Sequence, residues 1–150
     1  FLFHLKLLYR NIMELNTLDK VKLINLKVLN LNNAYINVLE SVNNFFKIKR
    51  VFTVVIRNFQ NDKRGRHAHK IDHHIVTCPF GSIKFTVTDG IKTKNFILKD
   101  QSKAIYVPCH IWTETDYLEK NTVVTCYCSE EYNEKNYIRK FDEFIKFRNL

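Results

Sequence analysis

Near the middle of the chain stands the stretch Arg64-Gly65-Arg66-His67-Ala68-His69-Lys70, followed by His73, His74 and Gly81. Two histidines separated by one residue face the same side of a β-strand, because side chains alternate along a strand with a period of two. Ala68 then faces the other side. Both imidazoles can therefore address one cavity, where histidine serves as a metal ligand or as a general acid or base near neutral pH.

The sequence around this stretch predicts β-structure. Between Val21 and Val124, short runs rich in β-branched and aromatic residues alternate with polar turns, and 3.6-residue periodicity is almost absent. Asp89-Gly90 separates two such runs and is typical of a tight hairpin. The predicted strands are 21–29, 35–40, 48–56, 73–78, 82–88, 92–98, 104–107 and 122–127. Residues 58–65 are predicted to form a polar loop.

The pattern changes after Ser129. Apolar residues then recur at intervals of three and four, with charged residues between them: Tyr137, Ile138, Phe141, Phe144 and Ile145. This spacing predicts an amphipathic C-terminal helix that packs on the outside of the sheet. Asn133 or Ser129 would cap its start.

Composition limits the class of protein. The chain has 150 residues, of which 45% are hydrophobic and 13% aromatic, with three Gly and two Pro. These values exclude a disordered or collagen-like chain and predict one globular domain. Because Met13-Glu14 resembles a natural start, we expect 1–12 to be an upstream segment and 13–150 to be the domain. We find neither a signal peptide nor a run long enough for a transmembrane helix.

Cysteine spacing and net charge limit which metals, compartments and binding partners are expected. The four cysteines, at 78, 109, 126 and 128, form no CxxC pair. This spacing favours buried thiols in a reducing cytoplasm over a zinc site. The net charge is +9, but the lysines are spread along the chain without a dense basic stripe, so no nucleic-acid partner is expected. A positive field would also attract a small anionic substrate such as a nucleoside diphosphate.

The histidine stretch resembles the first cupin motif, in which Gly65, His67, His69, His74 and Gly81 match the pattern. More of the chain, from about 22 to 147, resembles the sugar 3,4-ketoisomerases, which are WxcM-like cupins. The matching elements are Ile48-Lys49-Arg50-Val51, the histidine stretch, Cys78 with Gly81-Ser82, Asp89-Gly90, Tyr106-Val107, Trp112 and Tyr137-Ile138-Arg139 with Phe141-Asp142.

This resemblance implies an all-β cupin (RmlC-like) jelly-roll barrel with one C-terminal helix. It also implies a homodimer, often with exchanged N-terminal strands, and no metal or other cofactor. The implied reaction isomerises dTDP-4-keto-6-deoxyglucose to a dTDP-3-keto-6-deoxyhexose through an enediol, in deoxyamino-sugar biosynthesis. His69 would be the main acid/base and His67 its partner. The configuration of the product at C4, gluco or galacto, stays open.

Further residues are candidates for substrate binding. Arg64 and Arg50 could stabilise an enediolate or bind the diphosphate, because guanidinium groups bind such anions in bidentate fashion. Tyr106 and Trp112 could stack on thymine or sugar. His74, at the fourth matched position, is another candidate. The resemblance implies a substrate-facing tyrosine where this chain has Phe52-Thr53. Either Thr53 or a nearby tyrosine such as Tyr127 replaces it, or the substrate or the stereochemical outcome differs.

Two alternatives keep the cupin fold. In one, His67, His69 and His74 form a three-nitrogen metal site for Fe, Mn, Ni or Zn. Thr113 stands where the second cupin motif would supply its histidine, and His110 is displaced from that position by three residues. In the other alternative, the protein binds a sugar nucleotide without catalysis.

Overall fold

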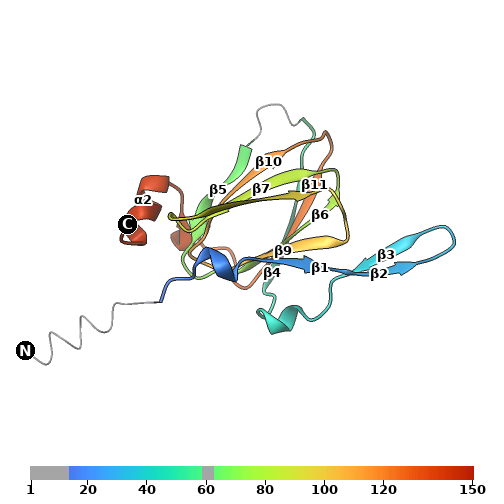
Figure 1. Cartoon of the computed structure of the whole chain (residues 1–150), viewed down its shortest axis with the longest axis horizontal. Helices are drawn as coiled ribbons and strands as arrows, with labels where there is room; N and C mark the ends of the chain where they lie inside the picture. The colour runs from blue at the N-terminus through green and yellow to red at the C-terminus, as the bar shows by residue number, and fades with distance from the viewer. Residues whose placement is uncertain (1–13, 59–62) are drawn as a thin grey trace, which may run out of the picture.

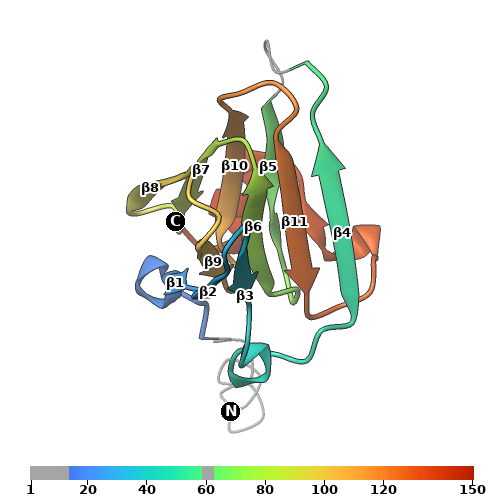
Figure 2. The same cartoon turned by 90° about the vertical axis from the view of Figure 1, so that its right-hand side faces the viewer.

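Two five-stranded antiparallel sheets face each other in the computed structural model, which describes residues 14–58 and 63–150 (Figure 1, Figure 2). The first sheet has the order β1 (Lys22–Asn25), β9 (Lys103–Val107), β6 (His74–Phe80), β11 (Val123–Cys128) and β4 (Arg50–Val55). The second has the order β12 (Tyr137–Ile138), β5 (Lys63–His69), β10 (Trp112–Tyr117), β7 (Ile83–Thr88) and β8 (Thr93–Leu98). The predicted all-β architecture with a C-terminal helix is confirmed. The upstream segment expected at 1–12 lies outside the described residues.

Side chains that alternate along the strands fill the space between the sheets. Along β7, Ile83, Phe85 and Val87 are buried, while the residues between them are half-buried. The same core cluster contains Ile105 from β9 and Val124 from β11, so both sheets contribute to it. Burial of one face of each sheet is the main apolar contribution to the stability of this sandwich.

The predicted hairpin at Asp89-Gly90 is confirmed as the turn between β7 and β8. Gly90 has a φ of 88°, which glycine adopts without a Cβ clash. One carboxylate oxygen of Asp89 accepts hydrogen bonds from the N–H groups of Ile91 and Lys92, at 3.0 and 2.8 Å. The other accepts from the N–H of Leu18 at 3.0 Å, which ties the segment η1 (Leu18–Lys20) to this turn.

The C-terminal helix is shorter than the periodicity predicts. Helix α2 spans Phe141–Phe147, whereas Tyr137 and Ile138 form β12 and pair with β5. Asn133 caps η3 (Glu134–Asn136) instead of α2. The predicted start and caps of the helix are therefore wrong, because the edge of β5 offers these two residues backbone hydrogen bonds. The packing is as predicted, since Phe144 is fully buried against the outside of the second sheet.

The strands also differ from the prediction, most clearly at β5, β10 and the first predicted strand. β5 begins inside the predicted loop 58–65, and β10 was not predicted at all. The inward residues of β10 include Thr113 and Thr115, so its interior face carries hydroxyl groups instead of the apolar residues that mark a strand. The predicted strand 21–29 is divided at Leu26, whose N–H donates to Ser102. β1 lies before this point, and β2 (Lys27–Asn30) lies after it.

Strands β2 and β3 (Tyr35–Val38) form a separate two-stranded sheet that extends away from the body of the molecule (Figure 1). The segment η2 (Val42–Asn44) then leads back to β4. Helix α2 lies at the opposite side of the molecule (Figure 1). Within the described residues, no helix combines the length and apolar character needed to span a membrane.

Candidate active site

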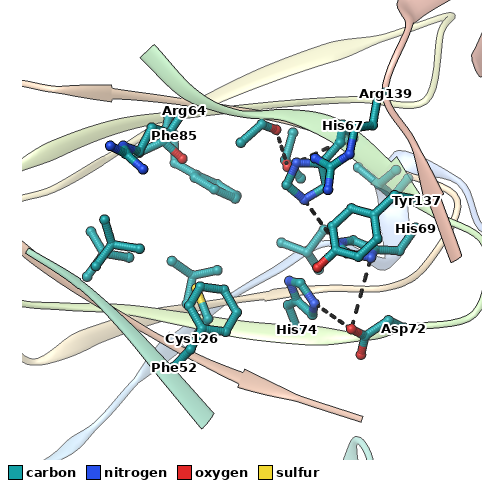
Figure 3. A pocket seen from close by; sticks show the side chains of 18 of the residues that line it. Phe52, Arg64, His67, His69, Asp72, His74, Phe85, Cys126, Tyr137 and Arg139 are labelled. Atoms are coloured by element: carbon teal, nitrogen blue, oxygen red, sulfur yellow. Dashed lines mark hydrogen bonds and ion pairs between the residues drawn. The ribbon is translucent and has the colours of Figure 1, made fainter. Parts of the chain in front are cut away.

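A cavity of about 360 Å³ lies between the two sheets (Figure 3). Its wall combines apolar residues such as Phe52, Phe85 and Val124 with a cluster of ionisable side chains. The histidines gather at one end of the cavity, and Arg64 lies toward the other end (Figure 3). Such a pocket, apolar with a few convergent polar groups, is typical of a small-molecule site.

His67 and His69 both face this cavity from β5, as their spacing predicts, while Ala68 is buried on the other side near α2. Their Nε2 atoms lie 3.0 Å apart, so one ring is the donor of a hydrogen bond and the other is its acceptor. Burial, together with the charge of His74, lowers the pKa of His67 to about 4. The same two causes lower the pKa of His69 further below its usual range. Both rings are therefore neutral at pH 7 and can take up a proton.

Asp72 forms the centre of an ion-pair network beside this pair. The side chain is 1% exposed, and its Oδ2 accepts hydrogen bonds from Arg50 Nη2 and His74 Nε2, each at 2.9 Å. Burial acts to raise the pKa of Asp72, but the hydrogen bond and the charge of His74 outweigh it and lower the pKa. Burial likewise acts to lower the pKa of His74, but the hydrogen bond to Asp72 is the main reason that this pKa rises to about 9. At neutral pH the carboxylate is ionised and His74 is an imidazolium.

Tyr137 is a cavity residue that the sequence-based site prediction missed. Its ring lies 4.4 Å from the ring of His69 and 5.0 Å from that of His67, measured between centroids. Arg139 stacks over this phenol at 4.3 Å and also lines the cavity. The signal is the Tyr137-Ile138-Arg139 motif, but the apolar spacing predicts a helix for its first two residues, which form β12. As a strand paired with β5, the motif places a phenol next to both histidines.

Of the two arginines predicted to bind substrate, Arg64 lines the cavity. Arg50 is not among the lining residues and instead donates to Asp72, which lies between it and His74. Arg50 thus contacts a buried carboxylate through Nη2, and its role as a substrate ligand stays a prediction. His74 lines the cavity, as expected for a site residue.

Three other substrate-binding candidates, Thr53, Tyr106 and Trp112, do not line the cavity of this chain. Strand alternation turns each outward, because their neighbours Val54, Val107 and Thr113 occupy the inward positions. Thr53 Oγ1 bonds instead to Thr125 Oγ1 at 3.1 Å. Tyr106 bonds to His73 Nδ1 at 3.0 Å, and Trp112 packs against Phe144 beneath α2.

Thr53, expected to replace a substrate-facing tyrosine, therefore does not reach this cavity. Tyr127, the other residue named for this role, does not line it either. Phe52 occupies the inward position on β4, and the phenols that reach the cavity come from Tyr117 and Tyr137.

The ionisable cluster does not fit a metal ion. The ligand atoms of His69, Asp72 and His74 lie within 4.8 Å of one another. However, Asp72 Oδ2 already accepts from Arg50 and His74, so a cation there would have to displace a guanidinium and remain beside it. His110, the other possible ligand, uses both ring nitrogens, toward the N–H of Asn16 and the carbonyl of Lys70, and is not a cavity residue. In the proposed three-histidine site, His67 and His69 bond to each other and His74 bonds to Asp72, so these contacts do not support a metal ion held by the three rings.

Comparison with known proteins identifies the family. Residues 19–149 match the family described as FdtA: WxcM-like, C-terminal. The chain belongs to the WxcM-like family. A relative from Aneurinibacillus thermoaerophilus, a TDP-4-oxo-6-deoxy-alpha-D-glucose-3,4-oxoisomerase, is 29% identical over 127 residues, which cover 84% of this chain and 91% of the relative.

Solved structures agree with this WxcM-like assignment. One is a histidine-to-asparagine mutant of the 3,4-ketoisomerase QdtA from Thermoanaerobacterium thermosaccharolyticum, in complex with TDP-4-keto-6-deoxyglucose. It has a TM-score of 0.81 and 28% identity, and the match covers 88% of this chain and 96% of that one. The rmlC epimerase of Mycobacterium tuberculosis, at 22% identity and a TM-score of 0.70 over 83% of this chain and 72% of that one, shares the fold. The predicted RmlC-like cupin fold and the predicted 3,4-ketoisomerase family are both confirmed.

Proposed function

We propose that this WxcM-like enzyme converts dTDP-4-keto-6-deoxyglucose to a dTDP-3-keto-6-deoxyhexose, in the synthesis of deoxyamino sugars. The observation that carries the proposal is the pair of neutral histidines in mutual hydrogen-bond contact on the wall of a cavity. The relative named above is a 3,4-oxoisomerase of the TDP-linked 4-keto sugar, and the QdtA mutant was crystallised with that sugar nucleotide. Both support this substrate for the present chain.

The chemistry needs a base that can also return a proton. The C4 ketone acidifies the proton on C3, and the neutral imidazole of His69 removes it to give an enediolate. The hydroxyl proton on O3 moves to O4, and a proton returned to C4 leaves a ketone at C3, so no proton is consumed overall. His67, hydrogen-bonded to His69, shares the proton between the two steps. Acid–base assistance of this kind contributes about 10²- to 10⁴-fold.

The other end of the cavity is suited to the diphosphate. Arg64 lies there, and a guanidinium binds phosphate oxygens in bidentate fashion. The net charge of +9 adds a field that attracts a dianionic substrate. We therefore assign Arg64 to the diphosphate, which directs the sugar toward the histidines.

The experiment that tests this proposal is proton NMR of the enzyme with dTDP-4-keto-6-deoxyglucose in D₂O. We expect a 3-keto product that carries deuterium at C4, and the coupling of the C4 signal in a parallel H₂O reaction distinguishes the gluco from the galacto product. Unchanged sugar signals at saturating substrate, with no exchange at C3, would overturn the proposal. Tight binding without exchange would instead support a sugar-nucleotide-binding protein.

We also propose that the enzyme is a homodimer in which the β2–β3 hairpin contacts the second copy. The hairpin exposes a series of apolar side chains: Val28, Leu29, Leu31, Tyr35 and Ile36. A two-stranded sheet that stands alone is marginally stable in water, so a second copy that buries these side chains would stabilise it.

For the location of the enzyme, we propose the cytoplasm. All four cysteines are buried free thiols, including Cys126 and Cys128 on the same strand. Burial raises the pKa of Cys126 above its usual range, which keeps this sulfur protonated. Free thiols of this kind are usual in a reducing compartment.

A further inference from the structure

Three imidazoles line one end of the cavity, but only one of them has an acidic partner within hydrogen-bond distance. His67 and His69 bond to each other, whereas His74 Nε2 bonds to Asp72 Oδ2 at 2.9 Å. The rings of His69 and His74 are 4.3 Å apart between centroids. The structure therefore places a neutral base and a carboxylate-paired imidazole side by side on the surface that would hold the reacting carbons.

The proposed reaction requires that this arrangement stabilise negative charge on the substrate. Burial lowers the pKa of both His67 and His69, and a base with a low pKa is a weak one. A weak base can remove the C3 proton at a useful rate only if the negative charge that forms on the substrate is stabilised strongly. Fixed positive charge in a buried site is an effective way to do this, because little solvent screens it.

We propose that His74, held as an imidazolium by Asp72, is the cationic group that stabilises the enediolate oxygens while the neutral His67–His69 pair transfers the proton. This inference rests on the proposed function and assigns His74 a catalytic role in it, and Asp72 a positioning role. Arg50, on the other side of the carboxylate, keeps Asp72 ionised and in place.

The proton balance of the reaction is unchanged by this role. His69 takes the C3 proton, the electron pair of that C–H bond forms the C3–C4 double bond, and the former carbonyl electrons reside on O4. His74 keeps both of its protons, with Nε2 bonded to Asp72, and its positive charge stabilises this oxygen. The hydroxyl proton on O3 moves to O4, and the imidazole pair, whose proton exchanges with solvent, delivers a proton to C4. The ketone is then at C3, and both imidazoles are neutral again.

The groups around His74 favour its charged form. Burial opposes protonation, but the hydrogen bond that His74 donates to Asp72, followed by the contact with Cys128, outweighs it, and the pKa of His74 rises to about 9. The titratable or charged groups near His74 come from every element packed around it: His67 and His69 from β5, Asp72 from the turn before β6, Arg50 from β4, Cys128 from β11, Tyr137 from β12, and Arg139.

The first test replaces His74 with Gln, which keeps a hydrogen bond to Asp72 but removes the charge. We expect kcat to fall by about 10²- to 10³-fold, with a smaller change in KM. His73→Gln is the matched control, because His73 is adjacent in sequence but contacts Tyr106 and Cys109 outside the cavity. Circular dichroism and the melting temperature confirm that each variant is folded. A His74→Gln enzyme with the kcat of His73→Gln would overturn the proposal.

The second test measures the pH dependence of kcat. If Asp72 had only a structural role, its substitution would not shift this profile. If the imidazolium is required, kcat is constant below the pKa of His74 and falls as pH rises through about 9. In Asp72→Asn the imidazolium loses its main partner, so this alkaline limb moves to lower pH by about one unit or more. The non-enzymatic rate in each buffer is subtracted. An alkaline limb at the same pH in the two enzymes would overturn the positioning role of Asp72.

A third measurement does not depend on turnover. Nitrogen-15 NMR of histidine-labelled enzyme reports the protonation of each imidazole, with the His74→Gln spectrum used to assign His74. We expect His74 to remain an imidazolium to about pH 9. If His74 is charged but the wild-type enzyme does not isomerise the sugar, the proposed function fails. If the sugar is isomerised but His74 titrates near 6.5, the inference fails and the proposed function stands.

Discussion

Two residues apart on one strand, His67 and His69 receive an environment that surface histidines do not have. Burial and the charge of His74 lower the pKa of His67 to about 4, so this ring stays neutral until the solution is strongly acidic. The base form is then lost only as pH falls through about 4. We expect kcat/KM to be constant between about pH 5 and 8 and to decrease about tenfold per unit below pH 4.

Initial rates in overlapping buffers measure this profile, with circular dichroism at each pH to separate protonation from acid unfolding. An inflection near pH 6.5, the ordinary value for histidine, would contradict the desolvated pair.

His69 is the residue on which the proposed reaction depends most. Asn in its place keeps a polar side chain of similar reach but cannot accept and return a proton. We expect His69→Asn to lose isomerisation and deuterium exchange at C3, by about 10³-fold or more, and to retain the fold and the binding of TDP. Calorimetry with TDP and the NMR assay measure the two properties. A His69→Asn variant that still isomerises the sugar would refute the role of His69.

Among the strands, the part of β5 that carries His67 and His69 is the part that the sequence predicts correctly. The spacing of His67 and His69 was enough to place both rings on one face. The start of β5 and the whole of β10 were missed, because inward residues such as Thr113 and Thr115 are polar and hide the usual alternation. β12 was assigned to a helix because Tyr137 and Ile138 continue the apolar spacing of α2, and only pairing with β5 distinguishes the two.

The turn between β6 and β7 depends on Gly81, whose φ is 78°. A Cβ there would lie 2.8 Å from the backbone Cα of Thr122, a contact that a side chain cannot relieve. We expect Gly81→Ala to lower the free energy of unfolding by about 2–4 kcal/mol, since the left-handed conformation and the clash both cost stability. Thermal unfolding would show a decrease in Tm of roughly 5–10 °C.

Gly90→Ala is the matched control for this substitution. Gly90 also has a positive φ, of 88°, but its Cβ would meet the flexible ends of Leu150 and Ile145. We expect a loss of about 1 kcal/mol. Equal losses in the two variants would show that the backbone contact at Thr122 is not the deciding factor.

At the scale of the whole molecule, the fold builds the site from segments that lie far apart in the sequence. Asp72 joins Arg50, 22 residues before it, to His74, and its other oxygen accepts from the N–H of Glu130, 58 residues after it. No local pattern marks this network, so the sequence predicted His74 as a substrate ligand and missed Asp72. The motif identified the family, but the protonation states follow only from which groups are buried together.

Assembly also depends on the whole molecule, because the β2–β3 hairpin exposes apolar side chains that its own chain does not cover. Leu29 and Ile36 are directly paired across the two strands and are 41% and 46% exposed. Burying two such side chains at an interface contributes about 3–6 kcal/mol, which corresponds to more than 100-fold in the dissociation constant. We therefore expect wild-type enzyme to sediment at twice the 18.0 kDa of the chain.

The double variant Leu29→Ser/Ile36→Ser should sediment as a monomer at micromolar concentration, because it removes that apolar contact. The control is Ile91→Ser, which changes a side chain that is 71% exposed in the turn between β7 and β8. Sedimentation velocity across a concentration series measures all three proteins. A wild-type monomer, or a double variant that remains dimeric, would contradict the hairpin as the dimer contact, whereas loss of the dimer in the double variant alone would locate the interface on β2 and β3.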